Sequence, residues 1–130
     1  MESLLFLALG GALGALGRFW TGLATTALFG SGFPAGTLIV NVAGSFLIGL
    51  TASAVAAGRL APSPWDALIM QGFCGALTTF STFSMDSFRL FREGRMAGAW
   101  VNLLLSMALC LSAAALGLSL LTPAAVPAHP

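Results

Sequence analysis

Apolar residues fill four long stretches of the chain, and short polar or Gly/Pro-rich turns separate them. The stretches cover about 3–29, 35–57, 65–90 and 96–121. A helix needs about 20 apolar residues to cross a hydrocarbon layer of about 30 Å, so each stretch is long enough. The pattern predicts an all-α membrane protein with four transmembrane helices, forming a single domain over 1–130. We expect the Pro/Ala-rich tail 122–130 to be disordered.

The third stretch contains residues that interrupt a helix, because 72–84 reads GFCGALTTFSTFS. In hydrocarbon, freed backbone groups cost several kcal/mol each unless protein, water or an ion binds them. We therefore predict that the third helix is broken in mid-membrane at a functional site. Unwound backbone from Gly75 to Thr78 would present carbonyl oxygens, which bind hard cations. The alternative is that Gly72 and Gly75 only permit close helix packing, as Gly10 and Gly14 do by their spacing in the first stretch.

Composition and charge support the membrane assignment. Hydrophobic residues make up 58% of the chain and charged residues 7%, whereas soluble domains have about 25% charged residues. The formal net charge is +1, so no basic surface is expected to attract nucleic acid. Cys74 and Cys110 both fall inside apolar stretches, where cysteines usually act as small buried hydrophobes.

The arginines near the helix ends do not specify one orientation. An even number of spans places both termini on one side of the membrane, together with Arg59, while Arg92 and Arg95 lie on the other side. Either this weak bias suffices, or the chain inserts both ways up. Insertion both ways would give inverted pairs, and a homodimer would cover the polar stripes of the helices.

The ionisable residues argue against catalysis. Arg18 and Asp86 are the ionisable side chains in the first stretch and near the end of the third, and no His or Lys lies within the spans, so no nucleophile and base can be paired. We expect that the protein is not an enzyme. Proton-coupled export of organic cations would need a carboxylate deep in the bilayer, and it remains the alternative to a channel. A non-transporting assembly subunit is a third class.

An anion pathway is predicted by the third and fourth stretches. Phe80 and Phe83 are three residues apart and share a helix face, and the edges of aromatic rings carry partial positive charge. Ring edges, hydroxyls and an amide NH2 can hold an anion without a fixed charge that would retain it. Further polar residues recur at four-residue steps, namely Thr37, Asn41 and Ser45, then Asn102, Ser106 and Cys110. The alternative is that the Phe rings face lipid and the polar groups bond neighbouring helices.

The segment GTLIVNVAGSFLIG at 36–49, followed by GFCGALTTFSTFS at 72–84, resembles the Fluc (CrcB) family of small fluoride channels. The resemblance covers nearly the whole chain. It implies an antiparallel, dual-topology homodimer with two pores in the bacterial inner membrane. Each pore would conduct fluoride passively and so lower its toxicity in the cytoplasm. A sodium ion at the dimer centre would be structural and not transported.

The resemblance also implies roles for individual residues of this chain. The anion pathway would include Asn41, Phe80, Phe83, Ser106, Thr37 and Thr82. Arg18 would lie at the pore mouth, and the backbone carbonyls of Gly75 and Thr78 would bind sodium. Two positions depart from the family pattern: Cys110 replaces a common serine with a weak S–H donor, and Asp86 replaces an expected glutamate with a shorter side chain.

Overall fold

The computed structural model describes residues 1–121, and every regular element in this part is a helix. The elements are α1 (Glu2–Phe29), α2 (Ala35–Ala56), η1 (Asp66–Cys74), α3 (Gly75–Leu77), α4 (Phe80–Arg92) and α5 (Met96–Leu121). The prediction of an all-α fold is therefore confirmed for these residues. The predicted disorder of 122–130 concerns a segment outside the described residues.

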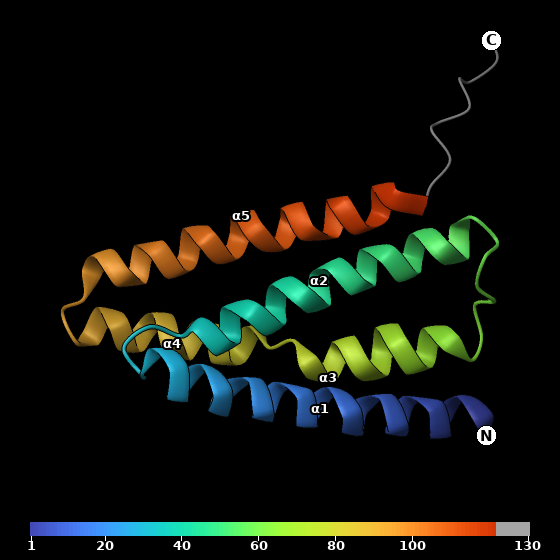
Figure 1. The fold of residues 1–130 in the computed structure, drawn as a ribbon, viewed down its shortest axis with the longest axis horizontal. Helices are drawn as coiled ribbons and strands as arrows, with labels where there is room; N and C mark the ends of the chain where they lie inside the picture. The colour runs from blue at the N-terminus through green and yellow to red at the C-terminus, as the bar shows by residue number, and fades with distance from the viewer. Residues whose placement is uncertain (122–130) are drawn as a thin grey trace, which may run out of the picture.

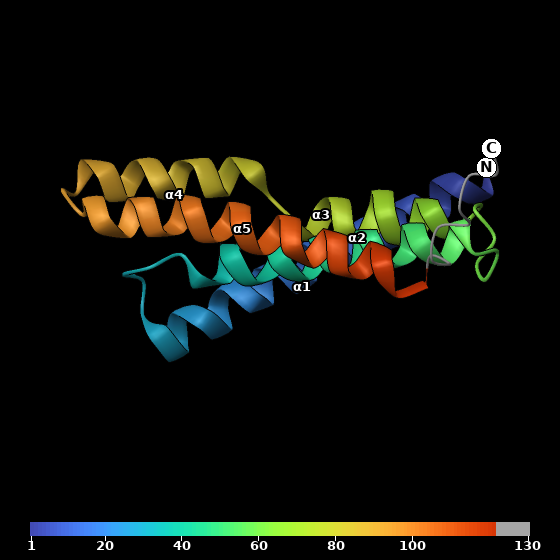
Figure 2. The ribbon, with the colours of Figure 1, turned by 90° about the horizontal axis from the view of Figure 1, so that it is seen from above.

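The helices lie side by side along the long axis of the molecule (Figure 1). α1 and the path from η1 through α4 run in one direction, and α2 and α5 return, so the N-terminus and the end of α5 lie at the same end. At the opposite end, α4 lies beside α5, while the last turns of α1 lie away from α4 in the view from above (Figure 2).

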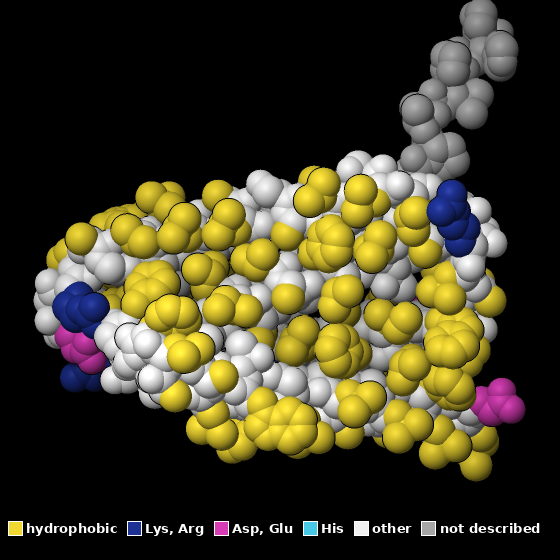
Figure 3. Space-filling model, in the orientation of Figure 1, with side chains coloured by type: hydrophobic (Ala, Val, Ile, Leu, Met, Phe, Trp, Pro, Cys, Tyr) yellow, Lys and Arg dark blue, Asp and Glu magenta, His cyan; other side chains and the backbone are white. Residues whose placement is uncertain are grey.

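Three helices are long and apolar enough to cross a membrane: Glu2–Phe29, Ala35–Ala56 and Met96–Leu121. Their ends agree with the predicted first, second and fourth stretches to within one residue. Apolar side chains cover most of the face seen in Figure 3, and charged side chains gather at the two ends. Many large apolar residues are exposed, including Leu9, Trp20 and Leu104. Such a surface suits a multi-pass membrane protein.

The third predicted stretch consists of three helical segments and not of one long helix. η1 is a π-helical segment that passes directly into α3, and Thr78 and Thr79 are extended, with ψ angles of 156° and 112°. α4 then starts at Phe80. The predicted unwinding from Gly75 to Thr78 was misplaced, because Gly75 is helical, with φ −60° and ψ −36°. The helical turns persist to Leu77 because the backbone of Thr79, and not of Gly75, is paired with another helix, as described below.

Glycines allow η1 to approach α1 closely. A Cβ atom added to Gly10 would overlap the carbonyl oxygen of Leu68, and one added to Gly14 would overlap that of Phe73. The predicted close packing at Gly10 and Gly14 is thus confirmed. A Cβ added to Gly44 of α2 would overlap Cγ2 of Thr78. The absence of side chains at these positions therefore lets η1 pack closely on α1 and lets Thr78 pack closely on α2.

Candidate functional site

The side chain of Asn41 in α2 binds the extended backbone at Thr79. The backbone N–H of Thr79 donates to Oδ1 of Asn41 over 2.7 Å, and Nδ2 of Asn41 donates to the carbonyl oxygen of Thr79 over 3.2 Å. The amide therefore satisfies both polar backbone groups of one residue, which would otherwise be costly to bury. This pair uses one of the two amide hydrogens, so the second can serve another acceptor.

Thr79 also starts α4. Its hydroxyl oxygen accepts from the backbone N–H of Thr82 over 3.2 Å, which is the usual role of an N-cap side chain. The same hydroxyl donates to Oγ1 of Thr82 over 3.1 Å and lies 3.1 Å from Oγ of Ser81. Capping of α4 thus explains in part why residues 78–82, TTFST, are rich in hydroxyl groups. It sets the direction in which α4, and with it the two Phe rings, leaves the extended segment.

Four of the predicted anion-pathway residues line one pocket of about 230 Å³. They are Asn41, Phe80, Phe83 and Ser106. The ring centroids of Phe80 and Phe83 are 5.4 Å apart at an interplanar angle of 48°. Phe83 is 6% exposed, whereas Phe80 is 76% exposed, so the two rings are not equivalent within one chain. Phe83 is part of the wall, and Phe80 extends beyond it.

The α5 side of this pocket contains a buried hydroxyl without a partner. Oγ of Ser106 has no hydrogen-bond partner within residues 1–121, although the residue is only 6% exposed. One turn earlier, Nδ2 of Asn102 donates to Oγ of Ser87 over 2.9 Å, and Oδ1 of Asn102 has no partner in the same part of the chain. Buried polar groups are nearly always paired, so an unpaired hydroxyl at a pocket wall indicates a place for a ligand or water.

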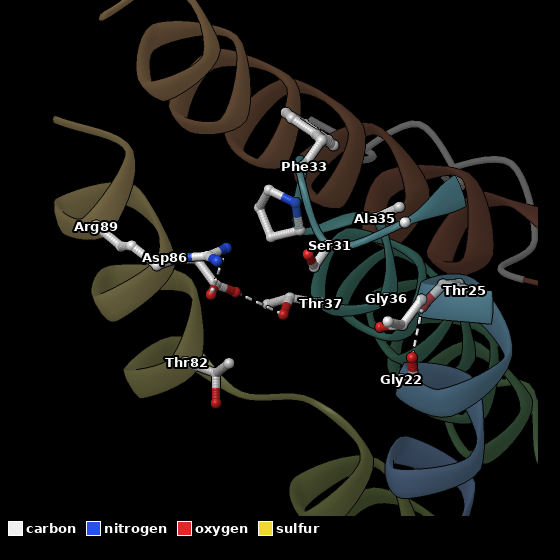
Figure 4. A pocket seen from close by; sticks show the side chains of 13 residues that line it. Gly22, Thr25, Ser31, Phe33, Ala35, Gly36, Thr37, Thr82, Asp86 and Arg89 are labelled. Carbon is white, nitrogen blue, oxygen red and sulfur yellow. Dashed lines mark hydrogen bonds and ion pairs between the residues drawn. The ribbon is translucent and has the colours of Figure 1, made fainter. Parts of the chain in front are cut away.

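Two adjoining hollows lie on the other side of the extended segment. The smaller, of about 280 Å³, is drawn in Figure 4, where Asp86 and Arg89 of α4 face Thr37 of α2. Oγ1 of Thr37 donates to Oδ2 of Asp86 over 2.9 Å, and Nη2 of Arg89 lies 3.7 Å from Oδ1. Asp86 therefore has two partners, and the Thr37 hydroxyl proton is directed to the carboxylate. Thr37 lies in this hollow and does not line the Phe pocket.

The larger hollow, of about 600 Å³, contains Arg18 and Thr82, together with Thr37 at its border with the smaller one. Arg18 also reaches the extended segment, since its Nη1 lies 3.5 Å from the carbonyl oxygen of Thr78. Thr79 lines both this hollow and the Phe pocket. The extended segment thus borders both a hollow that contains an arginine and a smaller pocket with aromatic and polar side chains in its wall.

The predicted cation ligands are backbone groups on the surface of the described chain. In a continuous helix the N–H of Thr79 would donate to the carbonyl of Gly75, but here it donates to Asn41. The Gly75 carbonyl therefore lacks its usual helical donor, and Gly75 is exposed. Carbonyl oxygens of this kind fit a hard cation. Within residues 1–121, no group of three His, Cys, Asp or Glu side chains could hold a metal ion.

The sequence analysis missed three interactions of this site. It assigned Asn41 only to an anion, gave Asp86 no partner, and did not single out Thr79. The partners of Asn41 and Asp86 lie 38 and 49 positions away along the chain. No local pattern reveals such pairs. An Asn in an apolar stretch, followed in a later stretch by two threonines, was the only signal available.

Comparison with known proteins gives a consistent result over most of the chain. A family model described as "CrcB-like protein, Camphor Resistance (CrcB)" matches residues 5–118. The chain is 50% identical over 116 residues to a protein of Vibrio parahaemolyticus, covering 89% of this chain and 91% of that protein. It is 46% identical over 121 residues to a protein of Shewanella amazonensis, covering 93% and 97%. Both proteins are named "Fluoride-specific ion channel FluC".

Proposed function

The chain belongs to the CrcB family, and from this premise we propose that it is a fluoride-specific channel through which the anion crosses the membrane passively. The observation that carries the proposal is the pocket shared by Asn41, Phe83 and Ser106. It combines the ring of Phe83, the amide hydrogen of Asn41 that is not donated to Thr79, and the hydroxyl of Ser106, which has no partner within residues 1–121. Such donors can replace the water around a small anion.

The geometry supports a path in two parts. Anions would gather in the larger hollow, where the guanidinium of Arg18 raises their local concentration. They would then pass Thr79 into the Phe pocket. No charged side chain lines that pocket, so an anion is held there only by hydrogen bonds and ring edges. Weak binding of this kind lets the ion leave again, as conduction requires.

Asp86 has a supporting part in this mechanism. A free carboxylate beside an anion path would repel the permeant ion, but Asp86 accepts from Thr37 and pairs with Arg89. These contacts offset its charge and tie the start of α2 to α4.

We further propose that two oppositely oriented copies form a homodimer in the bacterial inner membrane. Phe80 is exposed although it extends the wall of the pocket, so a second copy would complete that wall. The arginines are divided between the two ends, with Arg59 at one and Arg92 and Arg95 at the other. This balance gives little orientational bias and is compatible with insertion both ways up.

A structural sodium ion between the two copies is also proposed. The carbonyl oxygens of Gly75 and Thr78 from each copy would coordinate it. The bound ion would thereby satisfy backbone carbonyls next to the extended segment of each copy. A guanidinium and a sodium ion repel each other. The proposal therefore requires Arg18 to release the carbonyl of Thr78, from which it already lies at the 3.5 Å limit of a hydrogen bond.

Reconstitution tests the function. Purified protein in liposomes loaded with potassium fluoride, with valinomycin to carry the counter-charge, should release fluoride to an ion-selective electrode. The same vesicles loaded with potassium chloride should retain chloride. Fluoride release no faster than from protein-free vesicles would refute the proposal. Uptake of an organic cation driven by a pH gradient, without fluoride release, would instead support an exporter.

A further inference from the structure

Two sulfur atoms of α5 face the Phe pocket. Met107 and Cys110 are three residues apart, so they share a face of the helix, and both line the pocket of about 230 Å³. Met107 is 54% exposed and Cys110 is partly exposed. The other cysteine, Cys74, is completely buried at 0% exposure in η1. Only one of the two thiols is therefore accessible in the described chain.

A second observation marks this wall as a ligand site. Ser106 precedes Cys110 by one turn and lines the same pocket, and its buried Oγ has no partner within residues 1–121. Its hydroxyl is free to donate to a charged sulfur or to offer a lone pair. The wall thus presents a hydroxyl, a thioether and a thiol within residues 106–110 of one helix.

We propose that this wall binds a soft monovalent metal ion, Ag⁺ or Cu⁺, through Sγ of Cys110 and Sδ of Met107. Soft thiolate and thioether ligands favour such ions over hard cations. Binding removes the thiol proton, so that Cys–SH and Ag⁺ give Cys–S–Ag and H⁺, and the proton leaves to water. No oxidation or reduction takes place. The product is neutral, which suits a site without a charged neighbour in the pocket.

The bound ion occupies the pocket that Ser106 and the two Phe rings line, and it therefore blocks anions. Blockage rests on the proposed function, because it assumes that the pocket is the anion path. Metal binding itself does not rest on it. The backbone carbonyls proposed for sodium offer hard oxygen ligands, which a soft ion such as Ag⁺ does not favour.

The test uses full-length protein in liposomes and silver nitrate in chloride-free buffer. Cys74→Ala serves as the background, and each variant is compared with its own silver-free fluoride efflux. Silver should stop efflux in the background protein. Cys110→Ser should raise the silver concentration that halves efflux at least about 100-fold, because the thiolate ligand is lost. Met107→Leu should raise it about tenfold, because the thiolate of Cys110 remains. Met85→Leu, an exposed methionine of α4, should change nothing.

A second measurement does not depend on conduction. Alkylation of Cys110 by a maleimide, followed by mass spectrometry of the detergent-solubilised protein, should be slowed by silver in the background protein and less so in Met107→Leu. Unchanged alkylation would refute the metal site. Slowed alkylation in a conducting protein that silver does not inhibit would refute the block. A protein that never conducts would refute the proposed function, while the alkylation result would still decide whether the metal binds.

Discussion

The side-chain amide of Asn41 pairs with both backbone groups of Thr79, a residue 38 positions later in the chain. This pairing lets two residues remain extended between α3 and α4 without leaving buried polar groups unsatisfied. It also brings the amide to the wall of the pocket that contains Phe83 and Ser106. One side chain therefore both maintains the interruption and supplies a donor to the proposed anion path.

Replacing Asn41 by Asp should affect both functions. The carboxylate can still accept from the N–H of Thr79 but cannot donate to its carbonyl, so stability should fall by about 1–3 kcal/mol. The added negative charge beside the pocket should lower fluoride efflux at least about tenfold. Electrode-monitored efflux and thermal unfolding in detergent measure the two effects. Wild-type efflux in a folded Asn41→Asp protein would contradict the role of the amide.

Ser106→Ala should separate conduction from stability. Its hydroxyl has no partner within residues 1–121, so removing it should leave stability unchanged or slightly raised. Fluoride efflux should nevertheless fall several-fold, because a donor to the anion is lost. Ser119→Ala is the matched control, since Ser119 is an exposed serine of the same helix whose hydroxyl donates to the Leu116 carbonyl. Equal efflux in the two variants would show that the Ser106 hydroxyl is not used.

Arg18→Gln should reduce fluoride entry in a salt-dependent way. The guanidinium lines the larger hollow and acts on approaching anions through its charge. At an ionic strength of about 0.01 M the Debye length is about 30 Å, so the loss should be several-fold; at about 1 M it is about 3 Å, and the loss should nearly vanish. Initial efflux rates at both salt concentrations test this. A loss of equal size at both would indicate a structural role through the Thr78 carbonyl.

Removal of sodium should abolish efflux if the proposed cation holds the two interruptions together. A protein purified in potassium or lithium salts should be inactive and less heat-stable, and added sodium should restore both properties. Ligand binding to the folded state raises stability by RT ln(1 + [L]/Kd), so the melting temperature should rise with sodium concentration. An active protein whose melting temperature ignores sodium would exclude the assignment to Gly75 and Thr78.

The predictable part of this structure is local, and the unpredicted part is tertiary. The bounds of α1, α2 and α5 follow from the length of apolar runs, because a hydrocarbon layer imposes a minimum length on each of them. The close approach at Gly10 and Gly14 follows from residue size. The position of the extended residues does not, because Asn41 determines it from another helix.

The same division between local and tertiary features applies to the candidate site. Grouping Phe83, Asn41 and Ser106 into one pocket was predictable, because each lies on a polar or aromatic stripe of an apolar helix. The partners of Asp86 were not, because its contact with Thr37 depends on how α2 and α4 meet. The unequal exposure of Phe80 and Phe83 was also not predictable from their spacing, which places both on one helix face.

The most direct test of the central claim, that fluoride passes between the Phe83 ring and the donors of the pocket, is the efflux rate of Phe83→Ile beside that of Phe6→Ile. Both changes roughly keep side-chain volume and remove one aromatic contact, because Phe6 packs edge-on against Trp65 with centroids 6.0 Å apart. Phe6 does not line the pocket. We predict that Phe83→Ile lowers fluoride efflux at least about tenfold while Phe6→Ile conducts like the wild type. Equal efflux from a folded Phe83→Ile protein would contradict the account.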